Sequence, residues 1–135
     1  MTIAPDMYSR IIAAKMYIDE NFQESIDLDR ISREACISRF HFHRLFTQVY
    51  HQTPHRYLTQ KRINLAIKLL KEEEITVREV CSSIGFESMG SFSVLFKKVI
   101  GSAPHCYRRK AKKILNQTRE QPAKFIPGCF LNSFG

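Results

Sequence analysis

The sequence predicts an all-α protein in which two similar helical units are joined by one long central helix. Apolar residues recur at helical spacing along most of the 135 residues, and alternating strand patterns are nearly absent. Residues 38–57 resemble residues 88–107 without gaps, so one helical unit occurs twice. The segment 53–71 between the copies carries apolar residues on more than one face, which is typical of a helix packed on two sides.

The first helical unit is expected within residues 8–52. Its first amphipathic helix is expected over 8–21. Asp27 is suited to N-cap a short helix, and a tight turn follows at 36–37. Ser38 is suited to N-cap a second, longer helix whose apolar side chains fall at i, i+3, i+4 and i+7.

The central helix is expected over 53–72. Thr53 is suited to be its N-cap, and Pro54 occupies the first helical position, where a missing N–H does no harm. Its wide apolar stripe predicts that it lies wedged between two small bodies.

The second helical unit is expected within residues 73–113. Thr76 and Glu79 form a capping-box pattern, and Ser88 is suited to cap the longer helix that Gly101 ends. The apolar residues of that helix are expected to point inward: Phe92, Leu95, Phe96 and Val99. Pro104 begins a last helix, which is expected to be short and to end in a basic run. A C-terminal extension is expected over 114–135, and its part from Asn116 onward is expected to be mostly irregular.

The repeat shows what kind of unit this is. Eight of the twenty aligned positions are identical, and they are caps, apolar positions of the longer helix and the start of the helix that follows. The outward positions differ almost everywhere. A short capped helix, a tight turn and a longer capped helix make a helix-turn-helix, whose second helix enters the DNA major groove.

The composition agrees with a nucleic-acid partner. Lys and Arg total 21 and Asp and Glu total 13, so the formal net charge is +8, which favours a polyanion or an anionic membrane surface. No apolar run reaches the roughly 18–20 residues of a membrane span, and the N-terminus lacks a signal-peptide pattern. A cytoplasmic protein with no membrane partner is therefore expected.

The reactive side chains do not form a recognisable active site. The four cysteines, at positions 36, 81, 106 and 129, make no C-x-x-C pair, so no zinc site is expected, and they are interpreted as reduced thiols, mostly buried. No paired catalytic carboxylates, Ser/His/Asp set or phosphate-binding glycine loop is present. No enzymatic activity, metal or cofactor is expected.

These features resemble the DNA-binding domain of the AraC/XylS family of bacterial transcription regulators. The resemblance covers about residues 8–112 and rests on two motifs. The first contains Ile37-Ser38, Arg44-Leu45-Phe46, Pro54, Tyr57-Leu58, Arg62-Ile63, Ala66 and Leu69-Leu70; the second contains Ile84-Gly85-Phe86-Glu87-Ser88, Phe92-Ser93, Phe96-Lys97-Lys98, Gly101, Pro104 and Tyr107-Arg108-Arg109.

The resemblance implies a fold of about seven helices, with two helix-turn-helix subdomains on the central helix, that binds two successive major-groove segments. Only seven residues precede the first expected helix, so the chain is similar to the stand-alone members of the family. Those members are monomers that activate transcription. The expected partners are therefore promoter DNA and RNA polymerase.

In the first recognition helix, the residues left outward are Arg39, Phe40, His43, Arg44 and Thr47, and we expect the first four to read bases. Arginine is the usual bidentate partner of guanine O6 and N7. Phe40 has two interpretations, contact with thymine methyl groups or sugars, and packing against the first helix. The resemblance favours the DNA contact, because the matching family position carries DNA-contacting aromatic residues.

The second recognition helix is expected to read less and anchor more. Its outward positions lack Arg, Asn and Gln, the bidentate readers, and Met89, Ser91 and Ser93 are the candidates for base contact. The candidates for phosphate contacts in both halves are polar or basic residues: Ser38, Thr47, Lys61, Arg62, Ser88, Lys97, Lys98, Arg108 and Arg109. Arg62 could equally pair with an acidic residue of its own fold.

Three alternatives stay open from the sequence. The chain could be a nucleoid-type nucleic-acid-binding protein with little sequence preference. The small number of polar side chains available for base readout on the second recognition helix would suit such a protein. The chain could also be a regulator that responds through a thiol. The apolar residues of the C-terminal extension could pack on the second subdomain, or dock on RNA polymerase or a regulatory protease.

Overall fold

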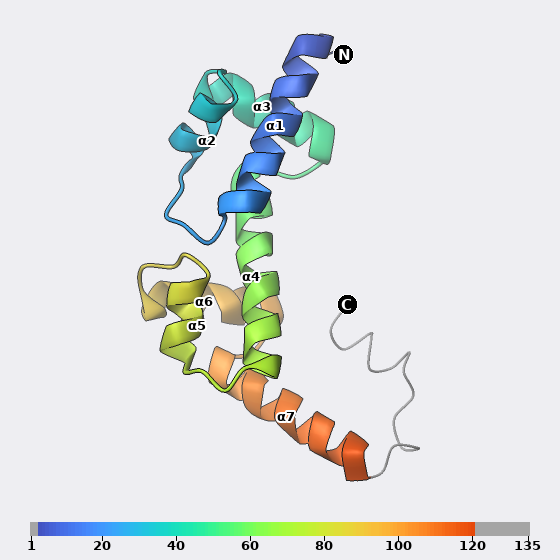
Figure 1. Ribbon diagram of the computed structural model, residues 1–135, viewed down its shortest axis with the longest axis vertical. Helices are drawn as coiled ribbons and strands as arrows, with labels where there is room; N and C mark the ends of the chain where they lie inside the picture. Colours follow the sequence, from blue (N-terminus) through green and yellow to red (C-terminus); the bar gives the residue numbers. More distant parts are fainter. Residues whose placement is uncertain (1–2, 121–135) are drawn as a thin grey trace.

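The computed structural model describes residues 3–120, which form helices and no strands. Two helix-turn-helix units are stacked along one long central helix, as Figure 1 shows, which confirms the predicted all-α architecture. The helices are α1 (Pro5–Asn21), α2 (Leu28–Glu34), α3 (Arg39–Tyr50), α4 (Pro54–Glu72), α5 (Val77–Ser83), α6 (Met89–Ile100) and α7 (Pro104–Glu120).

Five helices begin at the caps that the sequence predicts. In each case a side-chain oxygen accepts a hydrogen bond from the backbone N–H three residues later, at 2.8–3.3 Å. Each such cap stabilises its helix by about 1 kcal/mol. The capping residues are Asp27, Ser38, Thr53, Thr76 and Ser88.

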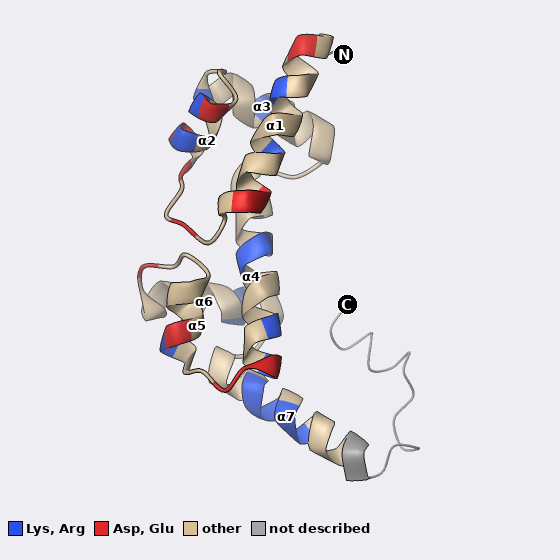
Figure 2. Cartoon of the chain, in the orientation of Figure 1, with Lys and Arg blue, Asp and Glu red and all other residues tan. Residues whose placement is uncertain are grey.

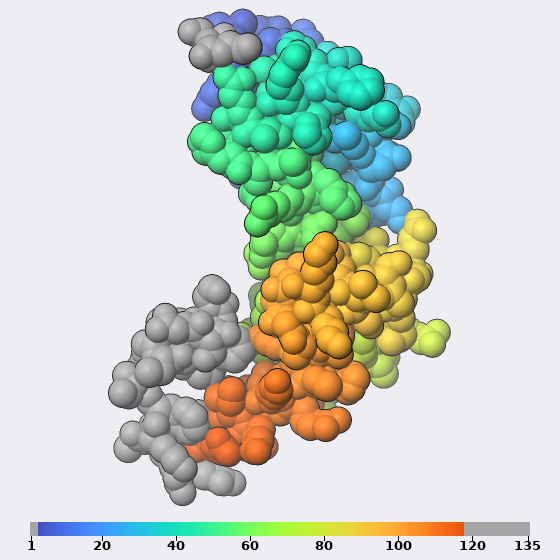
Figure 3. Space-filling model, turned by 180° about the vertical axis from the view of Figure 1, so that it is seen from behind, coloured from blue at the N-terminus to red at the C-terminus, as the bar shows by residue number. Residues whose placement is uncertain are grey.

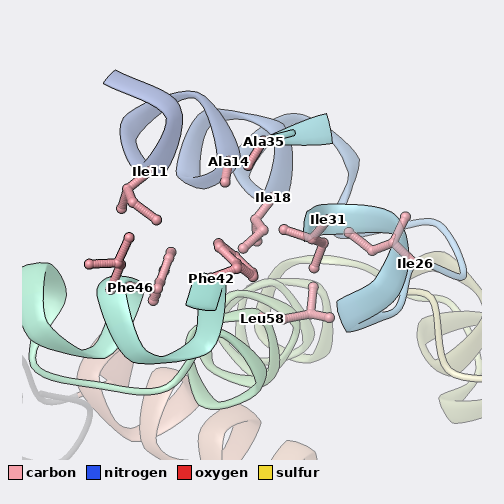
Figure 4. Close-up of a cluster of buried hydrophobic side chains, with 10 residues drawn as sticks. Ile11, Ala14, Ile18, Ile26, Ile31, Ala35, Phe42, Phe46 and Leu58 are labelled. Carbon is pink, nitrogen blue, oxygen red and sulfur yellow. The ribbon is translucent and has the colours of Figure 1, made fainter. Parts of the chain in front are cut away.

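The first hydrophobic core lies between α1, α2, α3 and the start of α4. Ile11 and Ile18 of α1 face Phe42 and Phe46 of α3, and Leu58 of α4 lies below them in Figure 4. The two phenylalanine rings meet edge to face with centroids 5.6 Å apart. This core fixes which side of α3 is turned away from the protein.

The second core repeats this arrangement around the other half of α4. Ile63 and Leu70 of α4 pack with Val80 of α5 and with Phe92 and Phe96 of α6. These two rings again meet edge to face, at 5.6 Å. Because α4 contributes buried residues to both cores, the prediction of a helix wedged between two bodies is confirmed.

Two expectations about the second half are wrong. The last helix is not short, because α7 continues to Glu120 through residues that were expected to be irregular from Asn116 onward. No Gly or Pro interrupts the chain between Pro104 and Pro122, and Ala111 packs into the second core. Val99, expected inward, is 45% exposed, because Ile100 packs against the core on that last turn of α6.

The two longer helices of the repeat, α3 and α6, lie on the same face of the molecule. Seen from behind in Figure 3, the teal α3 segment and the orange α6 segment both face the viewer, one above the other. Figure 2 shows Lys and Arg along α7 and at intervals on α4, whereas acidic residues gather at the α4–α5 connection. Within residues 3–120, no helix is both long and apolar enough to span a bilayer.

Candidate nucleic-acid interface

The outward face of α3 carries the side chains that the sequence assigns to base readout. Phe42, Leu45 and Phe46 are buried in the first core, so the opposite side of the helix is left to Arg39, Phe40, His43 and Arg44, which are all exposed. The structure therefore brings together the four residues predicted from the first half. Their contact with DNA stays a prediction.

Phe40 is 80% exposed, which excludes the interpretation that it packs against the first helix. The described contact of its ring is with the guanidinium of Arg39, whose Cζ lies 5.4 Å from the ring centroid. Arg39 also forms an ion pair with Asp29 of α2 at 3.3 Å. At the start of α3, a large apolar ring thus stands in solvent beside a cation that is held in place from α2.

The outward face of α6 is smaller and less polar than that of α3. Gly90, Ser91 and Val94 are exposed on it, and Ser93 is half-buried. Met89 does not point fully outward as expected, because it is half-buried against the second core. Since Ser88 turns the chain into α6 next to that core, the first side chain of the helix folds back on it.

The hydroxyl-bearing candidates for phosphate contact already have partners within the fold. Ser38 and Ser88 accept the capping bonds described above, and the Thr47 hydroxyl donates to the backbone carbonyl of His43 at 2.8 Å. A capping hydroxyl holds the helix N-terminus in shape, and its exposed oxygen can still meet a phosphate.

The basic candidates divide by exposure. Lys97, Lys98 and Arg109 are exposed. Lys61 is half-buried in an ion pair with Asp19 at 3.2 Å, and Arg108 donates from Nε to the carbonyl of Leu70 at 3.3 Å. The exposed residues Lys97, Lys98 and Arg109 can therefore reach a phosphate without breaking one of these contacts.

Arg62 has partners within its own fold, as one of its two interpretations expected, and its contact with a phosphate stays a prediction. Its Nε donates to the carbonyl of Phe22 at 2.8 Å, and its Nη2 donates to the carbonyl of Glu24 at 2.7 Å. Its Cζ also lies 5.7 Å from the ring centroid of Phe86 in the second unit. Burial lowers the pKa of Arg62. The expected partner within the fold was an acidic residue, but the partners observed are backbone carbonyls.

These bonds place Arg62 at the junction of the two units. An open pocket of about 430 Å³ lies at the junction and is lined from both sides, including Asp27 of the first unit and Phe86 and Ser91 of the second. Next to it, Gln23 donates to the carbonyl of Ser83 at 3.1 Å. Because α3 and α6 belong to different units, contacts at this junction set the angle between the two recognition helices.

A second polar network, which the sequence analysis missed, supports the first unit. Asp19 of α1 accepts hydrogen bonds from Tyr57 and from Lys15, and it forms the ion pair with Lys61. Burial by itself raises the pKa of Asp19, but these three donors outweigh it and hold that pKa below its ordinary value. Burial and the bond to Asp19 raise the pKa of Tyr57 to about 12.

Comparison with known proteins also identifies the chain as a helix-turn-helix protein. A family profile described as a helix-turn-helix domain matches residues 31–110. The HTH-type transcriptional regulator AlkR of Acinetobacter baylyi is 28% identical over 107 residues, which cover 79% of this chain and 34% of AlkR. The regulatory protein SoxS of Salmonella typhimurium is 28% identical over 94 residues, covering 70% of this chain and 88% of SoxS.

Among solved structures, the DNA-binding domain of the global transcriptional factor AdpA, in complex with a target DNA, superimposes with a TM-score of 0.71. It is 25% identical, and the match covers 83% of this chain and 96% of that domain. The chain therefore spans most of SoxS and of the AdpA domain, but about a third of AlkR.

Proposed function

Because the chain belongs to the AraC/XylS family of transcription regulators, we propose that it is a sequence-specific regulator that binds double-stranded promoter DNA as a monomer. The observation that carries the proposal is the pair of recognition helices on one face. Two helices in this arrangement can enter successive major-groove segments on one side of a duplex. A monomer with two such helices supplies both contacts that a dimer of single helix-turn-helix units supplies elsewhere.

The two helices have unequal tasks in this proposal. Arg44, exposed on α3, donates to a base edge, and Arg39, His43 and Phe40 complete the reading surface. On α6, Lys97 anchors the phosphate backbone, and Lys98 beside it and Arg109 of α7 are also exposed. In this proposal the protein activates transcription in the bacterial cytoplasm by contacting RNA polymerase, as its resemblance to the family implies.

Substitution of one reader and one anchor tests this division. Arg44→Ala is expected to weaken binding by about 1–3 kcal/mol and to relax preference at one base pair. Lys97→Ala is expected to weaken binding to every sequence alike and to flatten the slope of log affinity against log salt by about one. Affinities measured against a selected duplex and against random duplexes, at several salt concentrations, separate the two effects. Equal, sequence-independent losses from both substitutions would contradict the division.

A second candidate function is favoured by the apolar face of α6. A helix whose exposed residues lack Arg, Asn and Gln could serve a nucleoid-type protein that binds DNA with little sequence preference. The ratio of specific to random affinity decides between the two functions, since both bind DNA. If random DNA displaces the protein as readily as a selected site does, the nucleoid-type function replaces the regulator.

A further inference from the structure

The exposed face of α6 presents an apolar side chain where DNA would lie. Phe92 and Phe96 are fully buried in the second core, and Val94, between them in sequence, is 71% exposed. Gly90 precedes Val94 by four residues, so the two positions lie one above the other on the same helix face. Ser91 and Lys97 are also exposed on this helix.

Within residues 3–120, no neighbour of position 90 requires a glycine there. A Cβ built there would meet the Ser88 hydroxyl oxygen at 3.7 Å, which is an ordinary contact, and the backbone is not in the left-handed region. Glycine in a helix is nonetheless less favourable than alanine by up to about 1 kcal/mol. The missing side chain therefore suits a group that approaches α6 from outside the protein.

The chemistry of this face selects one feature of the major groove. Valine and glycine side chains offer no donor or acceptor, so they cannot read the hydrogen-bonding edges of bases. The C5 methyl group of thymine is the apolar feature of the groove, and apolar side chains contact it. Building on the proposed function, we propose that the surface formed by Gly90 and Val94 contacts thymine methyl groups in the second DNA segment.

The internal repeat shows how this reading differs from that of α3. At the fifty-residue offset, Gly90 aligns with Phe40 and Val94 aligns with Arg44. On α3 the pair is a large exposed ring followed by a guanidinium, and on α6 it is an open backbone followed by a small apolar group. At the position of Arg44, the first segment is thus read through hydrogen bonds, whereas at the matching position of Val94 the second segment is read through methyl groups.

Replacement of thymidine by deoxyuridine tests this directly, because deoxyuridine lacks the C5 methyl group and keeps the hydrogen-bonding edge. In a duplex selected from a random pool, each thymidine of both segments is replaced in turn and the affinity of the full chain is measured. At one or two positions of the second segment, the wild type is expected to bind about 3- to 5-fold more weakly, the factor expected from exposing one methyl group.

Two variants assign the effect to this face. Val94→Ala is expected to abolish the difference between thymidine and deoxyuridine at one of these positions. Val99→Ala, which shortens another exposed valine of α6, is expected to retain it. Gly90→Ala is expected to raise the melting temperature and lower the affinity for the selected duplex, because the added methyl group favours the helix but occupies the approach.

The outcomes separate this inference from the proposed function. If the protein prefers the selected duplex but tolerates deoxyuridine throughout the second segment, methyl reading by α6 is refuted and the regulator stands. The same holds if Val94→Ala retains the full sensitivity to deoxyuridine. If no duplex is preferred over random DNA, the proposed function fails and this inference fails with it.

Discussion

Replacement of Arg62 by methionine removes one of the links between the two helix-turn-helix units while keeping an unbranched stem in place. Two charge-assisted hydrogen bonds to the carbonyls of Phe22 and Glu24 are lost, together with the contact with Phe86. A desolvated bond to a charged group contributes about 1.5–3 kcal/mol. The bond to Glu24 is exposed and contributes less, and the contact with Phe86 contributes about 0.5 kcal/mol.

Part of this stabilisation is offset by the burial that lowers the pKa of Arg62, because methionine is free of that desolvation penalty. The expected loss in the free energy of unfolding is therefore about 2 kcal/mol. Urea unfolding followed by circular dichroism measures it. Lys68→Met, which removes an exposed cation of the same helix, is the matched control and should change stability by less than about 0.5 kcal/mol.

The alternative assigned to Arg62 by the sequence, a phosphate contact, predicts the opposite pattern. Stability would then be unchanged, while DNA affinity would fall and the salt slope would flatten by about one. That result would refute the role of Arg62 as a link between the units. Loss of stability with altered spacing preference between the two DNA segments would support it.

Three further predictions follow from other parts of the fold. Gly85→Ala should destabilise the protein by more than the roughly 1–2 kcal/mol that left-handed backbone strain costs, because its Cβ would lie 2.9 Å from a backbone oxygen of the first unit. Gly101→Ala has the same strain but open space around the new Cβ, so its loss of stability in urea unfolding should not exceed that strain. Asp19→Asn should lower the free energy of unfolding at neutral pH and leave it nearly unchanged in acid. The lowered pKa of Asp19 stabilises the wild type at pH values above the ordinary pKa of 3.8, and this contribution is lost as the pH falls through the pKa of the folded state. Equal losses at both pH values would exclude the network. Iodoacetamide followed by peptide mass spectrometry should label Cys36, which is exposed, well before Cys81, whose thiol is buried and has a raised pKa; early labelling of Cys81 would contradict the second core.

The same labelling experiment addresses thiol-dependent regulation. The expectation of mostly buried cysteines is wrong for Cys36, because the tight turn between α2 and α3 holds it in the left-handed region with φ of 56° and leaves its side chain in solvent. Mild oxidation that modifies Cys36 and changes DNA binding would favour the thiol-responsive alternative. Unchanged binding would remove it.

Local signals in the sequence were sufficient to predict the frame of the protein. Ser38 and Ser88 act as caps because a short hydroxyl side chain bonds the third N–H that follows it, wherever the helix lies. The buried faces of α3 and α6 followed from helical spacing, and the repeat supplied the pairing of the two units. These features depend on residues within a few positions of each other.

The junction and the polar network could not be predicted, because they join residues far apart in the sequence. Arg62 bonds backbone carbonyls that lie 38 and 40 residues before it, and a carbonyl acceptor carries no side-chain signature. Asp19 and Tyr57 are likewise 38 residues apart. For Phe40 the sequence left two interpretations, and only its observed exposure decides between them. The interpretation of the C-terminal extension beyond Glu120 lies outside the described residues.

Selection of bound duplexes from a random pool tests the central claim most directly. A protein that places α3 and α6 in successive major-groove segments should enrich one site with two conserved blocks, whose centres are about one helical turn of 10 base pairs apart. Arg44→Ala should blur the first block and leave the second intact. Enrichment of a single block, or of no defined sequence, would contradict the claim that this chain reads DNA through two tandem helix-turn-helix units.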